Sequence, residues 1–221
     1  MPADKSSQRT ADPSVLAALG EPLRSLAERG AVRHYRKGSI LIEEGEAGDT
    51  LYIILSGRLR SYSVSAAGRE ITYGIYGPGE YLGEMSLDGG PRSASVQALE
   101  ASVCAVVTRH TLERFIEDQP QFAMFMLRQV IRKARAATMS AKQMALNDVY
   151  GRLALLLDSL AKPQLDSTRL VAERLTHQQM AALLGCSREM VSRLMKDLER
   201  GGYVLPKGAG WVVEPTLPKR W

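Results

Sequence analysis

With 221 residues, 45% of them hydrophobic and 24% charged, the chain is long enough to bury a core and too apolar for wholesale disorder. Its net charge of +5 is uneven: residues 1–118 carry −3, residues 119–149 carry +4 and residues 150–221 carry +4. This asymmetry suits a polyanionic partner for the C-terminal part only. A polar N-terminus, two cysteines and the absence of an apolar run of about 18–20 residues exclude a membrane span and a disulfide scaffold, and predict a cytoplasmic protein.

Short β-rich segments punctuated by glycine follow a helical lead-in at residues 13–30. Eleven of the 19 glycines lie between Gly38 and Gly90. Strands are expected at residues 39–43, 50–55, 59–64, 71–76 and 102–107. Because glycine reaches positive φ at low cost, turns of this kind allow tight closure, and the pattern predicts a small antiparallel barrel or roll.

A short helix at residues 109–118 and a longer one at residues 120–147 are expected next. The longer segment has no internal Gly or Pro, and its apolar or small residues recur every three or four positions on one stripe. The stripe consists of Phe122, Met126, Val130, Ala134, Ala137, Ala141 and Met144. A helix packed on its own domain would show a similar stripe, but a helix of this length between two globular parts more often pairs with a copy of itself. We therefore expect a homodimer.

The C-terminal third has the pattern of a winged helix-turn-helix. Helices are expected at residues 148–162, 176–184 and 187–200, with a short β-prone or loop stretch at 164–173 and a β-hairpin at 203–213. Thr176 and Ser187 are suited to cap the last two helices, and Gly185 to form the left-handed turn between them.

The last of these helices carries an outward-facing set of charged residues. If Val191 and Leu194 face inward, Arg188, Glu189 and Arg193 project outward together. In a major groove, arginine pairs with guanine and glutamate accepts a hydrogen bond from cytosine. An ordinary αα corner with a solvated charged face has the same spacing, but the glycine turn and the hairpin favour double-stranded DNA as the partner.

A second polar group lies within residues 82–95. A cyclic nucleotide offers one anionic phosphodiester and one ribose 2′-hydroxyl, and Arg92, Ser93 and Glu84 supply matching partners near the glycine turn Gly89-Gly90. Taken alone, the segment also fits a surface turn or a buried Glu84–Arg92 ion pair that closes the roll.

Three segments together resemble the Crp/Fnr family of transcription regulators. Residues 185–193 (Gly-Cys-Ser-Arg-Glu-Met-Val-Ser-Arg) are similar to the family's recognition helix, and residues 148–154 to its hinge and the helix that follows. Gly-Glu followed by Arg-Ser-Ala is similar to its phosphate-binding cassette, so that the likeness covers residues from about 30 to 215. The resemblance implies an α+β chain with a cyclic-nucleotide-binding β-roll and flanking helices at 1–118, a dimerisation helix at 119–147 and a winged helix-turn-helix DNA-binding domain at 148–221.

The resemblance also implies a role for individual residues. The expected cyclic-nucleotide-binding residues are Gly83, Glu84, Met85, Arg92, Ser93, Ala94 and Thr138. Within this set Glu84 would bind the ribose, Arg92 and Ser93 the phosphate, and Thr138 would lie near the purine amine. The expected DNA-binding residues are Thr176, His177, Gln178, Ser187, Arg188, Glu189 and Arg193. Of these, Arg188, Glu189 and Arg193 would read a TGTGA-like half-site and the others would contact phosphates.

The effector implied is cyclic AMP, with cyclic GMP and cyclic di-GMP as rivals, and RNA polymerase is implied as a further partner of this bacterial regulator. Three departures from the family's pattern bear on the recognition of the purine. Gly83 and Arg92 stand nine positions apart, two fewer than in an enteric member of the family. In addition, Gly74 replaces a serine and Ala137 replaces a threonine. Losing one such hydroxyl is worth about 0.5–1.5 kcal/mol, so phosphate binding is less affected than base choice.

Other functions are less well supported by the residues. Cys104 and Cys186 are too few for an iron–sulfur sensor, and His34, His110 and His177 are too scattered for haem ligation, so no metal is expected. The absence of a catalytic triad or Walker loop predicts that the chain is not an enzyme. Two alternatives stay open: a regulator active without ligand, its cassette a relic held by the Glu84–Arg92 pair, and a cyclic-nucleotide-binding module whose winged helix binds protein.

Overall fold

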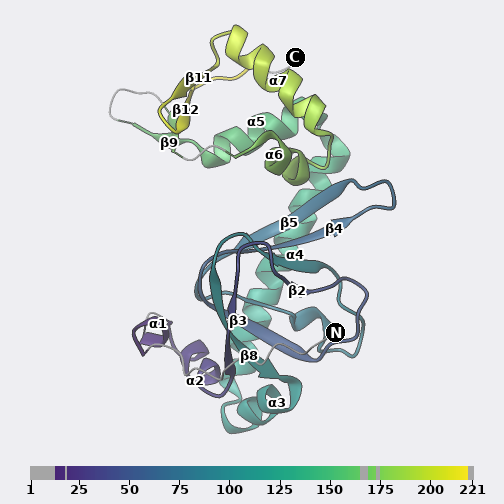
Figure 1. The fold of residues 1–221 in the computed structure, drawn as a ribbon, viewed down its shortest axis with the longest axis vertical. Helices are drawn as coiled ribbons and strands as arrows, with labels where there is room; N and C mark the ends of the chain where they lie inside the picture. The colour runs from purple at the N-terminus through teal and green to yellow at the C-terminus, as the bar shows by residue number, and fades with distance from the viewer. Residues whose placement is uncertain (1–12, 18, 165–168, 173–174, 219–221) are drawn as a thin grey trace. The chain divides into compact units, whose positions relative to one another are not determined.

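The computed structural model describes residues 13–17, 19–164, 169–172 and 175–218 (Figure 1). The chain divides into two compact units, one of Met1–Ser63 and Thr72–Lys133 and the other of Val64–Ile71 and Ala134–Trp221. The elements up to the long helix are α1 (Pro13–Ala17), α2 (Leu23–Ala27), β1 (Ala31–Tyr35), β2 (Ile40–Ile42), β3 (Thr50–Ser56), β4 (Leu59–Val64), β5 (Glu70–Tyr76), β6 (Tyr81–Leu82), the 3₁₀ helix η1 (Glu84–Ser86), β7 (Ser95–Ala98), β8 (Ser102–Thr108), α3 (Arg109–Asp118) and α4 (Gln121–Leu146). The remaining elements are α5 (Val149–Leu160), β9 (Lys162–Pro163), β10 (Arg169–Val171), α6 (His177–Leu184), α7 (Arg188–Arg200), β11 (Val204–Lys207) and β12 (Gly210–Val213).

The first unit contains a β-roll built from two antiparallel sheets. One sheet has the strand order β1-β8-β3-β6 and the other β2-β7-β4-β5. Strands β3 and β8 pair along their length, with Thr50 opposite Thr108 and Ile54 opposite Cys104. Together with the helices, these sheets give the α+β class that the sequence predicts.

The alternation of side chains along β3 shows how this roll is held together. Leu51, Ile53 and Leu55 point to one face, where they pack with buried residues of α2, α3 and the start of α4. Ile54 points to the other face, into a second core shared with β2, β4 and β7. Cys104 of β8 is fully buried in this second core, and burial raises the pKa of its thiol to about 12. A thiol held so fully protonated behaves as an apolar filler.

The second unit packs helices against a small antiparallel sheet of order β11-β12-β10-β9. Its core is formed by buried side chains of α5, α6 and α7 and by Trp211 and Val213 of β12. The β11–β12 hairpin follows α7 directly, as Figure 1 shows, and β11 lies against that helix. This is the winged arrangement that the sequence predicts.

Several details differ from the expectations. The lead-in at 13–30 forms two short helices, α1 and α2, because Gly20 and Pro22 interrupt the helical pattern. Strands β1, β6 and β7 were not expected, since they are short or carry polar residues at alternate positions. Residues Lys162–Pro163, expected to end a helix, instead form the edge strand β9. Helix α3 has the bounds predicted from the sequence.

Candidate functional site

The cassette begins with a backbone turn that only glycine tolerates. Gly83 has φ +96°, and a Cβ at this position would lie 2.5 Å from the carbonyl oxygen of Thr50 and 2.8 Å from Nη1 of Arg92. Glu84–Ser86 then forms a single 3₁₀ turn, which is followed by the loop that leads to Arg92. Gly83 is therefore required both by its conformation and by the close approach of the arginine.

Arg92 is a buried cation whose described partners are all neutral. Its side chain is only 7% exposed. Nη1 donates to the carbonyl of Gly83 at 3.0 Å and to Oγ of Ser86 at 2.8 Å, and Nη2 donates to Thr50, to its carbonyl at 3.0 Å and its hydroxyl at 2.9 Å. None of the ion pairs between described residues includes Arg92. A buried arginine without a carboxylate favours the binding of an anion, because a charge removed from water is stabilised by an opposite charge.

Glu84 has one satisfied and one free carboxylate oxygen. Its side chain is 8% exposed, and Oε1 accepts a hydrogen bond from Nζ of Lys133 at 2.9 Å. The same ammonium donates to the carbonyl of Tyr81 at 2.8 Å and lies over the rings of Tyr76 and Tyr81. Oε2 of Glu84 is buried and has no partner in the part of the chain described here. A buried acceptor without a hydrogen bond lowers the stability of the folded state unless a donor binds to it, and the hydroxyl of a ligand is a suitable donor.

The ion pair expected as a rival explanation of the cassette is therefore absent from these residues. Glu84 pairs with Lys133, while Arg92 is bonded to Thr50, Gly83 and Ser86. The alternative of a Glu84–Arg92 pair that closes the roll is therefore contradicted, because Lys133, 49 positions away in the sequence, supplies the cation instead.

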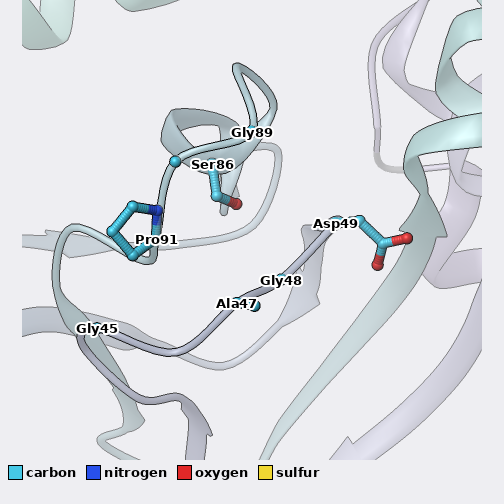
Figure 2. A pocket seen from close by; sticks show the side chains of 8 residues that line it. Gly45, Ala47, Gly48, Asp49, Ser86, Gly89 and Pro91 are labelled. Carbon is cyan, nitrogen blue, oxygen red and sulfur yellow. The ribbon is translucent and has the colours of Figure 1, made fainter.

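The remaining cassette residues lie at the surface beside a shallow hollow. Ser93 is exposed and its hydroxyl donates to the sulfur of Met85 at 3.4 Å, while Ala94 is partly buried. The hollow, of about 570 Å³, is lined by Gly45, Ala47, Gly48, Asp49, Ser86, Gly89, Gly90 and Pro91. Figure 2 shows the loop Gly45–Asp49 facing the segment from Ser86 to Pro91 across it. Arg92 lies directly behind Gly48, since a Cβ there would collide with its guanidinium. Glu84 is not part of the lining, so the hollow borders the cassette without containing all of it.

Thr138 belongs to the second unit, on the exposed part of α4. Its hydroxyl donates to the carbonyl of Ala134 at 3.0 Å. Its contact with a purine stays a prediction.

The turn between α6 and α7 is built as the sequence predicts. Thr176 caps α6 in a reciprocal box with Gln179: its hydroxyl accepts from the Gln179 amide at 3.2 Å, and Oε1 of Gln179 accepts from the Thr176 amide at 2.8 Å. Gly185 adopts the left-handed conformation with φ +64°. Ser187 caps α7 by accepting from the amide of Met190 at 3.2 Å. These caps fix where each helix begins.

Helix α7 presents one polar face to solvent. Val191, Leu194, Met195 and Leu198 are buried in the core of the second unit. The opposite face carries Arg188, Glu189, Ser192, Arg193 and Lys196, which line a shallow hollow of about 470 Å³. The prediction that Arg188, Glu189 and Arg193 project outward together is confirmed. Ser192 and Lys196 were missed, although both follow Glu189 at helical spacing on the same face.

The expected phosphate contacts lie at or beside the helix starts. Gln178 is exposed and His177 partly exposed in the first turn of α6. The hydroxyl of Ser187 accepts from a backbone amide, so its proton is free to be donated to a phosphate. The hydroxyl of Thr176, by contrast, already donates its proton to Oε1 of Gln179 at 3.0 Å.

Arg152 joins this turn to the end of the long helix within the second unit. Its Nε donates to the carbonyl of Leu184, at the end of α6, at 3.0 Å, and Nη1 donates to the carbonyl of Asn147, after α4, at 2.8 Å. A cation suits both positions because helix C-termini expose unpaired carbonyls. Cys186 lies beside this junction, partly buried, and burial raises the pKa of its thiol.

Within the described ranges, no group of three or more His, Cys, Asp or Glu side chains is placed to hold a metal ion. Nor does any helix in these ranges combine the length and the apolar character that crossing a membrane requires.

A β-roll with this cassette, followed by a winged helix-turn-helix, defines a cyclic-nucleotide-binding regulator of transcription. Two family models match the chain accordingly: the cyclic nucleotide-binding domain over residues 32–119 and the Crp-like helix-turn-helix domain over residues 151–214. The chain belongs to the Crp/Fnr family of transcription regulators, which are DNA-binding proteins and not enzymes.

Curated relatives support the same assignment over nearly the whole chain. The chain is 31% identical over 209 residues to the CRP-like cAMP-activated global transcriptional regulator of Mycobacterium tuberculosis, covering 93% of this chain and 90% of that protein. It is 30% identical over 189 residues to the cAMP-activated global transcriptional regulator CRP of Salmonella typhimurium, covering 84% and 90%. Among solved structures, the c-di-GMP responsive global regulator CLP of Xanthomonas campestris superimposes with a TM-score of 0.77 at 24% identity, covering 88% and 98%, which shows a shared fold.

Proposed function

We propose that the chain is a homodimeric transcription regulator that binds cyclic AMP in its β-roll and then reads a palindromic, TGTGA-like operator. The observation that supports the proposal is that two buried polar side chains of the cassette each lack a partner of complementary chemistry in the described part of the chain. Among the described residues, Arg92 is a buried cation with no carboxylate partner, and Glu84 has a buried oxygen with no donor. A cyclic nucleotide supplies one phosphodiester anion for Arg92 and one ribose hydroxyl for Glu84.

The phosphate would be held by Arg92 and Ser93 together with backbone amides of the cassette, where Gly83, Met85 and Ala94 lie. The Thr50 and Ser86 hydroxyls that accept from Arg92 are neutral, whereas a phosphate oxygen carries the charge opposite to that of the guanidinium and forms a stronger bond, so exchange favours the anion. The ribose 2′-hydroxyl would donate to Oε2 of Glu84. Thr138 would approach the purine.

Cyclic AMP is favoured over other effectors by the relatives. The Mycobacterium tuberculosis and Salmonella typhimurium proteins are both described as cAMP-activated. The structural relative described as c-di-GMP responsive shares the fold only, at 24% identity, and does not decide the ligand.

The homodimer is supported by the exposed apolar residues of α4. Val130 and Met144 of the stripe are 42% and 41% exposed, although the stripe predicts that these positions are covered, and Ile131, next to Val130, is also 42% exposed. A second copy of the helix would bury them in an isologous interface. Burying this stripe would also set two recognition helices in a two-fold arrangement.

Sequence readout would come from α7. Arg188 and Arg193 would each contact a guanine and Glu189 a cytosine, while Thr176, His177, Gln178 and Ser187 would contact phosphates. The chain would act in the cytoplasm, with RNA polymerase as a further partner.

The switch would operate by a shift in population. Ligand binding that favours one arrangement of the two long helices also favours one placement of the recognition helices, and the coupling is reciprocal. Arg152 donates to the carbonyls of Asn147, just after α4, and of Leu184, at the end of α6. A movement of the end of the long helix would therefore be transmitted to the turn between α6 and α7.

The test is calorimetric titration of the purified chain with cyclic AMP, cyclic GMP and cyclic di-GMP. We expect saturable binding of one cyclic AMP per chain, and weaker binding of the other two. No heat with any of the three would overturn the proposal in favour of a regulator that acts without a cyclic nucleotide. Tightest binding of cyclic di-GMP would overturn the choice of effector.

A further inference from the structure

Strand β5 holds a glycine and a tyrosine that share space. Gly74 and Tyr76 are two residues apart, so their side chains point to the same face of the strand. A Cβ at Gly74 would lie 2.7 Å from the Tyr76 hydroxyl oxygen and 2.9 Å from Cζ. The φ of Gly74 is not positive, so its backbone does not require glycine. The missing side chain makes room for the phenol of Tyr76.

The phenol lies in the same neighbourhood as the carboxylate of the cassette. The ammonium of Lys133, which binds Glu84 at 2.9 Å, is 5.2 Å from the centre of the Tyr76 ring. Burial raises the pKa of Tyr76, and the charge of Glu84 raises it further, whereas a hydrogen bond from Ser61 opposes the shift. None of the residues that hold Arg92 is a described partner of Tyr76.

This placement indicates which part of a ligand the phenol would face. In a 3′,5′-cyclic nucleotide, the base is on C1′ and the 2′-hydroxyl is on the neighbouring carbon C2′. The phosphate joins the oxygens on C3′ and C5′, away from C1′. A ligand held by Arg92 at its phosphate and by Glu84 at its 2′-hydroxyl therefore presents its base on the Glu84 side. Tyr76 neighbours Glu84 through the Lys133 ammonium, which binds the carboxylate and lies over the phenol ring.

We infer that the Tyr76 hydroxyl, given room by Gly74, is a specificity-determining group for the nucleobase of the effector. The inference rests on the proposed cyclic-nucleotide site and adds the base contact to it. The phenolic hydroxyl of Tyr76 has a proton that it could donate to an acceptor on the base edge. Adenine and guanine differ in the donors and acceptors of that edge, so the proton would distinguish them.

The experiment measures affinities for cyclic AMP, cyclic GMP and 2′-deoxy cyclic AMP by calorimetry in the wild type and in Tyr76→Phe. We expect Tyr76→Phe to change the ratio of the cyclic AMP and cyclic GMP affinities by about three- to tenfold, the range for one hydrogen bond. The penalty for removing the 2′-hydroxyl should stay unchanged, because Glu84 is intact. Tyr73→Phe is the matched control: it is on the same strand, 56% exposed, and its hydroxyl donates to Ser63 at 3.0 Å.

Gly74→Ala adds a second, independent arm. The new methyl must displace the phenol, so it should alter the base ratio in the wild type and leave it unaltered in a Tyr76→Leu background. An unchanged ratio in Tyr76→Phe, or a change of equal size in Tyr73→Phe, would overturn the inference while the cyclic-nucleotide site stands. A wild type that binds none of the three nucleotides would instead overturn the proposed function.

Discussion

Replacing Lys133 by methionine tests whether this lysine holds Glu84 in place. The substitution keeps most of the apolar length of the side chain and removes the ammonium that bonds to Glu84 at 2.9 Å and to the Tyr81 carbonyl at 2.8 Å. Glu84 is then a carboxylate, 8% exposed, with no described cation beside it. Its Oε2 already lacks a partner among the described residues.

The expected cost follows from the burial of the pair. Removing one partner of a fully buried ion pair costs about 3–5 kcal/mol, because the other charge is left without compensation. The Lys133 side chain is 26% exposed, so water screens part of the interaction and we expect about 2–3 kcal/mol of lost stability. For a chain of this length, 1 kcal/mol shifts Tm by about 2–4 °C, which gives a fall of about 4–12 °C.

Thermal unfolding followed by far-ultraviolet circular dichroism measures this effect. Lys142→Met is the matched control, since Lys142 is exposed on the same helix and should change stability by less than about 0.5 kcal/mol. Adding Glu84→Gln to Lys133→Met should restore most of the loss, because both charges are then gone. Equal Tm values for Lys133→Met and Lys142→Met, or no rescue by Glu84→Gln, would refute the role given to this pair.

Three further predictions concern the ligand, the dimer and the operator. Arg92→Ala should weaken cyclic AMP binding by more than about tenfold in calorimetry, because a charge-assisted bond is lost, and wild-type affinity would show that the phosphate is bound elsewhere. Val130→Glu should convert the dimer to a monomer in light scattering at micromolar concentration, and a monomeric wild type would contradict the dimer. In a selection from randomised duplexes, Glu189→Ala should relax the preference at one base pair at a cost of about 1–3 kcal/mol, whereas Gln178→Ala should lower affinity evenly across sequences. The two half-sites selected by the wild type should lie about 10–10.5 base pairs apart, centre to centre. A non-palindromic consensus for the wild type would refute DNA recognition by a two-fold symmetric dimer.

Local signals in the sequence are sufficient for the helix-turn-helix of the second unit, although not for its edge strand β9. Capping residues, a glycine turn and helical periodicity act between neighbours in the chain, so the positions of Thr176, Gly185 and Ser187 follow from the sequence alone. The outward direction of Arg188, Glu189 and Arg193 follows from the same periodicity. The short strands β6 and β7 carry no such signal, because pairing with distant strands forms them.

The cassette shows the limit of sequence-based prediction. The residue types at Glu84 and Arg92 indicate a hydroxyl and an anion, but the only protein partner that the sequence suggested for Glu84, Arg92 as an open alternative, is not the one that the structure shows. Lys133 lies 49 positions from Glu84, in a helix predicted for a different purpose, and no local pattern connects the two. The room that Gly74 leaves for Tyr76 is also invisible in the sequence, because it depends on the side-chain position and not on spacing.

The most direct test of the account is a DNA titration with and without cyclic AMP. Fluorescence anisotropy of a labelled duplex with two TGTGA half-sites would be measured at one fixed salt concentration, since phosphate contacts make affinity depend on salt. The account predicts that cyclic AMP tightens wild-type binding by about 5- to 150-fold, the usual range of coupling between two sites, and leaves Arg92→Ala unaffected. Equal wild-type affinity in the presence and absence of cyclic AMP would contradict it.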